Sequence, residues 1–257
     1  MKDSSIPTIL AVAILLVGIT DGVIFIRNKQ IFNIYALNET SPKNVRVTNI
    51  KDSSFTISWT TDRKTSGFIR WGKTEPFLNR VSLSPSEKSS HTHFVNVEGL
   101  SPRTAYFFKI NSGGKEFDNN GINWKVQTGE LISTQSQAYI ISGKIITSLG
   151  EPVEGALVYT VIGGSSPLST LTTKEGGWTI NIGQARTLSL ANYISFDEEK
   201  TPIEILVQGG PNGIASAYMY SVSAKPAPPI VIGKTHNFKN TPSEEINYVP
   251  EARIDFP

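Results

Sequence analysis

Apolar and polar residues alternate through most of the chain after residue 42. An apolar side chain at every second position is typical of half-buried β-strands. Turn-forming residues interrupt the alternation about every 8–12 residues, as they do in Greek-key sandwiches. The pattern predicts strands at Asn44–Ile50, Ser54–Thr60, Ser66–Gly72, Asn79–Leu83, His91–Val97, Thr104–Asn111 and Ile122–Thr128.

A second series of strands follows a polar linker at residues 130–137. Ser189–Tyr193 suits a short helical or irregular stretch. After residue 239 the chain is polar and interrupted by prolines, so we expect 239–257 to be a flexible tail. The predicted strands of this second module are Ile140–Thr147, Ala156–Ile162, Ser169–Thr173, Trp178–Ile182, Ile203–Gln208, Ala215–Val222 and Ile230–Ile232.

The most apolar segment is Ile6–Ile26, whose 21 residues would rise about 31 Å as a helix, close to the thickness of a hydrocarbon core. Three interpretations remain open: an uncleaved membrane anchor over 1–30, a cleaved signal peptide and a buried core helix. Thr20-Asp21-Gly22 is a poor cleavage site, and no polar positions alternate to give a core helix an outer face. We favour the uncleaved anchor, followed by a tether at 31–41.

The charges that flank this segment do not support its expected orientation. Arg27 and Lys29 follow the span, while Lys2 is opposed by Asp3, so basic residues mildly favour keeping the following modules inside. We nevertheless expect a single-pass protein of the cell membrane with extracytoplasmic C-terminal domains, because the modules resemble exported ones. The fold class is thus all-β, with two Ig-like or Greek-key β-sandwich domains in tandem after one N-terminal transmembrane helix.

The first module, 42–129, resembles a fibronectin type III domain. It reads PKNVRVTNIKDSSFTISWTTD, then TSGFIRWG, then HTHFVNVEGLSPRTAYFFKI. Trp59 stands where the family has its second-strand tryptophan, and Leu100, Pro102, Thr104 and Tyr106 match its L-x-P-x-T-x-Y turn. The resemblance implies that Tyr106 bonds back to nearby backbone as a tyrosine corner.

The same sandwich resembles the one that precedes the catalytic domain of purple acid phosphatases. Those enzymes carry metal ligands in motifs such as GDxxY and GNHE, which do not occur in this sequence. Phosphate loops, G-x-S-x-G elbows and H-E-x-x-H motifs are also absent from it. We therefore expect a non-catalytic protein without catalytic, cofactor-binding or metal-binding residues.

The second module, 138–238, resembles the carboxypeptidase regulatory-like, prealbumin-like sandwiches. The resemblance rests on Gly143–Val158, which follows the pattern G-x-(I/V)-x-x-x-x-G-x-P-(V/I)-x-G-A-x-V, and on Thr173–Trp178. Ala191–Gly213 departs from the family as a long insertion, which leaves the topology of 184–213 open. Some similar surface sandwiches cross-link Lys to Asn, so Lys144 and Asn237 are a weak candidate pair for an isopeptide bond.

Composition narrows the possible partners. The 257 residues are 39% hydrophobic and 18% charged, with a net charge of +2, which is too small and dispersed for nucleic-acid binding. The sequence has no cysteine, so disulfides, thiolate metal sites and lipoprotein attachment are excluded.

Two short polar motifs have a structural explanation and a functional one. His91 and His93 would share one strand face, but a metal also needs a third ligand and the only other histidine is His236 in the second module, so we expect a solvated strand edge. Asp118–Gly121 begins like a calcium loop but lacks its later ligands. Because Asn and Gly tolerate positive φ, a tight turn at Asn120-Gly121 explains it.

Two functions remain as hypotheses. The first is a structural or adhesive surface protein that contacts a glycan or a protein through the Ser112–Gly121 and Gly209–Ala215 loops. The aromatic side chains considered for sugar stacking are Tyr218, Tyr220, Trp178 and Phe117, although we favour a core position for Trp178. The second is an accessory subunit of an envelope enzyme or of a secretion or pilus complex, bound to a protein partner.

Overall fold

The computed structural model describes residues 39–84 and 89–240. Contacts divide the chain into Met1–Glu39 and a compact unit from Thr40 onward. In the described part no helix is long and apolar enough to cross a membrane. The predicted anchor at Ile6–Ile26 and most of the tail lie outside the described residues.

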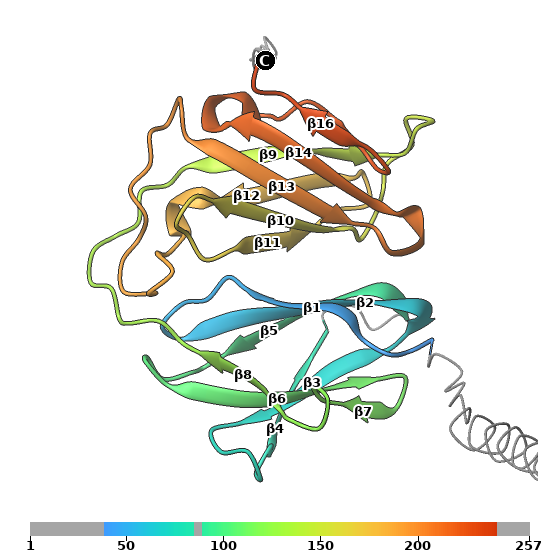
Figure 1. Ribbon diagram of the computed structural model, residues 1–257, viewed down its shortest axis with the longest axis vertical. Coiled ribbons are helices and arrows are strands. Elements are labelled where there is room, and N and C mark those ends of the chain that lie inside the picture. The colour runs from blue at the N-terminus through green and yellow to red at the C-terminus, as the bar shows by residue number, and fades with distance from the viewer. Residues whose placement is uncertain (1–38, 85–88, 241–257) are drawn as a thin grey trace, which may run out of the picture. The chain divides into compact units, whose positions relative to one another are not determined.

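The first module is a two-layer sandwich, as Figure 1 shows. One sheet has the order β1-β2-β5 and the other the order β4-β3-β6-β7, with β8 also paired to β6. Apolar side chains from both inner faces form its core, which includes Trp59 and Phe108. The strands are β1 (Lys43–Thr48), β2 (Ser54–Thr65), β3 (Gly67–Gly72), β4 (Arg80–Leu83), β5 (Ser90–Glu98), β6 (Ala105–Ser112), β7 (Lys115–Phe117) and β8 (Trp124–Gln127).

The second module is also a sandwich, with sheets β11-β10-β13-β14-β16 and β12-β9-β15. Its core is separate from the first and includes Trp178, which confirms the predicted core position. The strands are β9 (Ile140–Ile146), β10 (Leu157–Ile162), β11 (Leu168–Leu171), β12 (Gly177–Asn181), β13 (Pro202–Gln208), β14 (Ile214–Tyr220), β15 (Ile230–Val231) and β16 (Thr235–Asn237). Three 3-10 turns complete it: η1 (Ile182–Gln184), η2 (Gly210–Asn212) and η3 (Ser221–Ala224).

All fourteen predicted strands are present, and the described residues contain no α-helix. Two short strands were not predicted: β7, inside the expected Ser112–Gly121 loop, and β16 near the end of the second module. Residues 189–193 form no helix or regular strand; backbone hydrogen bonds and an isolated bridge between Arg186 and Tyr193 hold them. For the part of the chain that the structure describes, an all-β fold of sandwich modules is therefore confirmed.

Two local predictions for the first module are confirmed. The Tyr106 hydroxyl accepts a hydrogen bond from the backbone N–H of Ser101 at 2.8 Å, so the tyrosine corner is formed. Asn120 and Gly121 both have positive φ, at 56° and 90°. Gly121 N–H donates to the Asp118 carboxylate at 2.7 Å, which accounts for this aspartate as a turn residue without an ion.

Candidate functional site: the seam between the two sandwiches

The outer face of sheet β1-β2-β5 packs on the second sandwich. On β2 the apolar residues point into the core, so Thr56, Ser58 and Thr60 point outward, yet all three are buried. On β10 the outward side chains Leu157 and Tyr159 are also buried, although they belong to neither core. The two sandwiches therefore share a third buried layer, which we call the seam.

Hydrogen bonds between side chains hold the centre of the seam. The Ser58 and Tyr159 hydroxyls lie 2.9 Å apart, and those of Thr48 and Ser169 lie 2.5 Å apart. Burial raises the pKa of Tyr159, so its phenol stays protonated and can donate. A buried hydroxyl without a partner would be costly, so these pairs select one register between the sheets.

The side-chain amide of Asn49 pairs with the backbone of the edge strand β11, in the way that a neighbouring strand would. Its side-chain NH₂ donates to the Ser169 carbonyl at 3.0 Å, and its side-chain oxygen accepts from the Ser169 N–H at 2.9 Å. Its own backbone N–H donates to the Pro167 carbonyl at 3.0 Å. At the other end of the seam, Thr92 Oγ1 donates to the Gly155 carbonyl at 2.6 Å.

Arg186 is the one buried arginine among residues 39–84 and 89–240, with only 2% of the residue exposed. Its Nη2 lies 2.9 Å from the Asp52 carboxylate in the turn between β1 and β2. Its Nη1 donates to the carbonyls of Glu130, at 2.6 Å, and Leu190, at 3.2 Å. A single guanidinium thus joins the first sandwich, the linker and the second sandwich.

The linker is shaped around this arginine. A Cβ on Gly129 would lie 2.3 Å from Arg186 Nη1, so only glycine fits there without a shift. Gly129 N–H donates to the Lys51 carbonyl, and Glu130 N–H donates to the Leu190 carbonyl. The start of the predicted 130–137 linker is therefore bound to both sandwiches rather than free.

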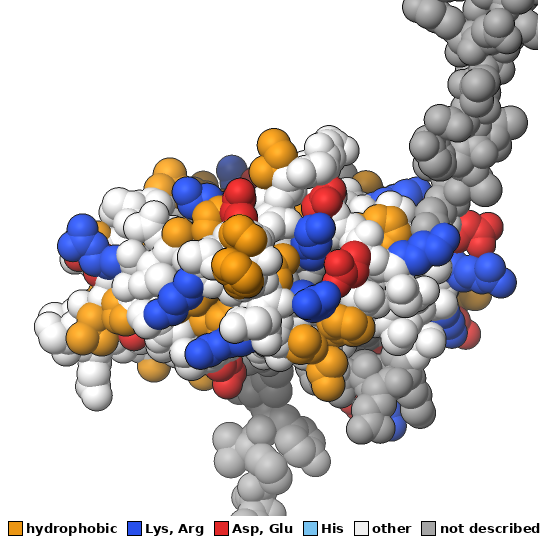
Figure 2. All heavy atoms as spheres, turned by 90° about the horizontal axis from the view of Figure 1, so that it is seen from below, with side chains coloured by type: hydrophobic (Ala, Val, Ile, Leu, Met, Phe, Trp, Pro, Cys, Tyr) orange, Lys and Arg blue, Asp and Glu red, His pale blue; other side chains and the backbone are white. Residues whose placement is uncertain are grey.

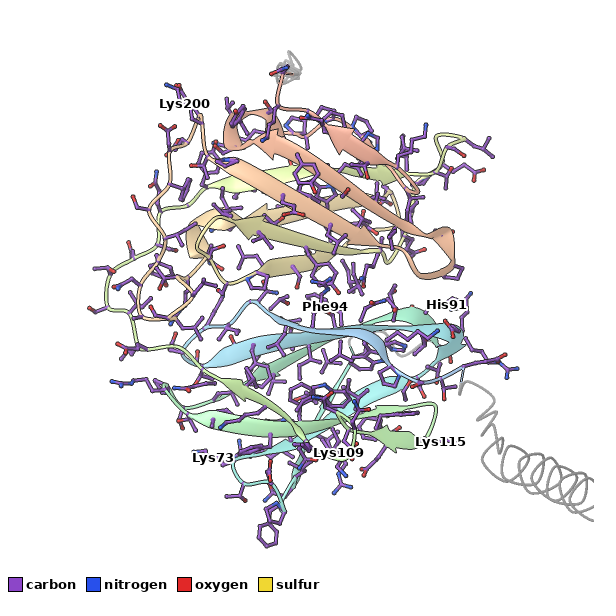
Figure 3. All side chains as sticks on the ribbon, in the orientation of Figure 1. Lys73, His91, Phe94, Lys109, Lys115 and Lys200 are labelled. Atoms are coloured by element: carbon purple, nitrogen blue, oxygen red, sulfur yellow. The ribbon has the colours of Figure 1, made fainter. Side chains whose placement is uncertain are left out.

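The Gly209–Ala215 loop approaches the first sandwich at Gly210, while Pro211, Asn212 and Ile214 are exposed, so its role as a contact loop stays a prediction. Gly210 has a φ of 60°, and a Cβ there would lie 2.8 Å from Cβ of His91. This close approach places η2 against β5 of the first sandwich. Phe94 of β5 also points out of its own core and is half-buried between the two sandwiches (Figure 3).

The prediction of a solvated edge at His91 and His93 is wrong for His93. Only 2% of His93 is exposed, and its ring stacks on Trp59 at a centroid distance of 4.7 Å. Burial lowers the pKa of His93 to about 4, with a further contribution from His91, so the ring is neutral at pH 7. Among the described residues no group of three His, Cys, Asp or Glu could hold a metal.

The aromatic residues considered for sugar stacking separate into two groups. Tyr218 and Tyr220 share the outer face of β14, and Tyr218 is 38% exposed. Trp178 is in the core and Phe117 is half-buried on β7, so neither joins them. The structure therefore brings two of the four residues together, on the second sandwich.

Lys144 and Asn237 lie on strands of different sheets, β9 and β16. Both residues are exposed. An isopeptide bond between them needs a buried Lys–Asn pair, so the arrangement does not support it.

The first sandwich has a recognisable relative among known families. Residues 42–128 match the model of the purple acid phosphatase N-terminal domain, which is fibronectin type III-like. The resemblance predicted for this module is therefore confirmed at the level of a fibronectin type III-like sandwich. The match covers about a third of the chain and describes the N-terminal domain alone.

Solved structures give weaker likenesses. They include PhoD (12% identity, TM-score 0.28, 43% of this chain and 23% of that one). The FN1–FN3 domains of chicken CNTN1 are 16% identical with a TM-score of 0.26, over 70% of this chain and 65% of that one. The central fibronectin-III array of RIM-binding protein is 15% identical with a TM-score of 0.24, over 68% of this chain and 60% of that one. The chain spans less than two thirds of each, and TM-scores this low carry no argument. No curated protein sequence matches the chain.

Proposed function

We propose that this chain is a membrane-anchored, extracytoplasmic structural and binding protein without catalytic activity. The observation that carries the proposal is the seam, because it joins two sandwiches through buried hydroxyl, amide and guanidinium contacts. Such a joint suits a protein that holds a contact surface on the second sandwich at a fixed distance and angle from the first. The predicted anchor at 1–30 and the resemblance of 138–238 to carboxypeptidase regulatory-like sandwiches are parts of this proposal.

The contact surface that we favour is the outer face of β14. Tyr218 and Tyr220 stand two residues apart on one strand, which separates them by about 7 Å. Glu204 lies beside Tyr218, with its carboxylate 3.4 Å from the Tyr218 hydroxyl, and Lys239 lies 5.9 Å from the ring centre of Tyr220. Two phenol rings flanked by charged groups suit a glycan or a polar protein surface.

The anchoring half of the proposal is tested by topology in a bacterial host. We expect the full chain with a C-terminal tag to remain in the membrane fraction after carbonate washing, and the tag to be cleaved by protease added to intact spheroplasts. A soluble full chain, or a tag that resists protease until the cells are lysed, would contradict it.

The binding half is tested with residues 40–257, the compact unit that contains both described cores. We expect this fragment to bind members of a glycan array, and the double variant Tyr218→Ala/Tyr220→Ala to lose that binding. Leu149→Ala/Leu188→Ala is the control, because it also removes two exposed apolar side chains of the second sandwich but lies outside β13 and β14.

A second candidate, an accessory subunit of an envelope enzyme, is favoured by the match of 42–128 to a module found in a phosphatase. Cross-linking of the full chain in membranes, followed by a pull-down, separates the two candidates. One stoichiometric enzyme partner, together with no glycan binding, would favour the accessory role.

A further inference from the structure

The second sandwich has an open edge at β12. This strand lies at the end of the sheet β12-β9-β15, and a tight turn joins it to β11, which lies at the end of the opposite sheet. Just outside β12, the Ile145 N–H donates to the Gly176 carbonyl and the Ile182 N–H donates to the Tyr139 carbonyl. Because the backbone groups of an antiparallel strand face alternate sides, residues 178 and 180 bond to β9, and Thr179 turns its N–H and carbonyl to the open side.

Two other edge strands carry features that oppose further pairing. On β11 the Asn49 side chain occupies the N–H and the carbonyl of Ser169. On β4 the Arg80 guanidinium lies over the ring of the inward-facing Trp71, and an inward charge disfavours the addition of another strand. Lys and Arg side chains are also spread over the sheet face to which β4 belongs (Figure 2). Among the described residues nothing comparable covers Thr179, which is exposed.

A groove follows this open edge. Its larger part, about 660 Å³, has a mainly apolar lining that includes Leu171 and Trp178. A smaller and more polar part of about 260 Å³ includes Asn181 in its lining. Thr170 of β11 and Thr179 of β12 line both parts, so the two adjoin along the strand. An unpaired strand edge beside such a groove suits an extended segment that adds to the sheet as a further strand.

One stretch of the chain outside the described residues has the pattern of such a strand. The tail is polar and interrupted by prolines, but within Ala252–Phe256 three apolar residues alternate strictly with Arg253 and Asp255. Strict alternation over five residues is typical of a strand with one buried face. Its length equals that of β12, Gly177–Asn181. One apolar face and one charged face are what a groove with an apolar wall and an open outer side requires.

The tail is long enough to reach the groove. It leaves the sandwich after β16, which is four strand spacings, or about 20 Å, from β11 across the sheet. Residues 241–251 span up to about 36 Å when extended. Lys144 of β9 pairs with Gly177, which has no side chain, so the Lys144 ammonium can extend across β12 towards the carboxylate of Asp255.

We propose that Ala252–Phe256 adds to the open edge of β12 as a further strand and closes the second sandwich. Its apolar side chains enter the groove beside Trp178, and its backbone bonds to that of Thr179. An unpaired edge is a site of pairing with other chains, so closure by the chain's own tail keeps neighbouring molecules apart. The inference depends on neither the predicted anchor nor the surface proposed for binding.

Hydrogen exchange at the Thr179 amide tests the pairing directly. In residues 40–257 we expect this amide to exchange at least about tenfold more slowly than in residues 40–240, which contain both cores and every described strand. The Ser169 amide, which Asn49 already binds, should exchange equally in the two fragments. Equal exchange of the Thr179 amide in both would overturn the proposal.

Two matched variants of residues 40–257 test the alternation. Ile254→Ser/Phe256→Ser removes apolar side chains that the groove would hold, so the Thr179 amide should exchange as fast as in residues 40–240. Arg253→Ser/Asp255→Ser changes two outward-facing residues of the same stretch and should keep the slow exchange. Equal exchange in the two variants, whether slow or fast, would contradict a strand whose apolar face is buried.

Disulfide trapping separates the chain's own tail from the tail of a second copy. The natural chain has no cysteine, so Thr179→Cys can be combined with Arg253→Cys or with Asp255→Cys. We expect one of these pairs to form a bridge within a monomer. Thr235→Cys, on the exposed edge of β16, is the control.

A tail that remains flexible would bridge to position 235 more readily than to position 179, because the loop to be closed is shorter. That result would overturn the proposal. A bridge between two chains would assign the added strand to a second copy and would overturn closure by the chain's own tail.

Discussion

The outer face of sheet β1-β2-β5 and the outer face of sheet β4-β3-β6 belong to the same sandwich, yet their side chains differ in kind. The first carries short hydroxyl residues such as Thr48 and Ser58, which are buried against the second sandwich. The second carries Arg70, Val81 and Leu83, which are exposed, and Lys109, which is half-buried. Short hydroxyl side chains allow two sheets to approach and bond, whereas long charged side chains keep a face in water.

The largest expected difference between the two faces is in the stability that their arginine ion pairs contribute. Arg186→Ala removes a buried guanidinium and leaves the Asp52 carboxylate unpaired in the seam, so we expect a loss of about 3 kcal/mol in the free energy of unfolding. Arg70→Ala breaks a pair of similar length whose side chains are 47% and 39% exposed, and should cost about 0–1 kcal/mol. Urea denaturation of residues 40–257 measures both, and equal losses would contradict the distinction between the faces.

His93 lies on the core-facing side of sheet β1-β2-β5 and predicts that the free energy of unfolding depends on pH. Because the pKa of His93 is about 4 in the folded chain against an ordinary 6.5, the unfolded chain binds the proton first as pH falls. Stability from this group is complete above pH 6.5 and is lost between pH 6.5 and 4, by about 3 kcal/mol in all.

Unfolding curves at pH 7 and pH 4 measure this loss. His93→Phe retains an aromatic ring beside Trp59 but cannot be protonated, so its decrease between the two pH values should be smaller than that of the unaltered chain by about the same 3 kcal/mol. If the free energy of unfolding fell equally in the two proteins between pH 7 and pH 4, the burial of His93 would not be the cause of the pH dependence.

A smaller effect is expected at the tyrosine corner, which lies within the first sandwich and away from both outer faces. Tyr106→Phe removes the acceptor of the Ser101 N–H and should cost about 1–3 kcal/mol in the unfolding free energy. Tyr218→Phe, on an exposed face, should change it by less than about 0.5 kcal/mol. If Tyr106→Phe left the free energy of unfolding unchanged, water would replace the phenol as the acceptor of the Ser101 N–H.

The sequence was sufficient for fourteen of the sixteen described strands and for the corner at Tyr106, because alternation and turn chemistry act over a few residues. The inward position of His93 was also encoded, since it shares a face with Val95 and Val97 on β5. The prediction instead followed the polarity of histidine, which favours an exposed position. Two-residue spacing is the better guide on a strand whose other inward positions are apolar.

The seam could not be predicted in the same way. A hydroxyl on the outer face of a strand is compatible with water and with a second sheet, and alternation does not distinguish them. Arg186 sits in a segment whose topology was left open, and its partners Asp52 and Glu130 are distant along the chain. Only the packing of the two modules brings these three residues together.

The central claim is that the buried seam holds the two sandwiches in one fixed arrangement. The natural chain has no cysteine, so spin labels can be attached to Leu83→Cys on β4 and Leu149→Cys on the second sandwich, both exposed positions. Pulsed electron-spin distance measurements on residues 40–257 should give a single narrow distribution, which Arg186→Ala broadens and Arg70→Ala leaves unchanged. A broad distribution in the otherwise unaltered chain would contradict the claim.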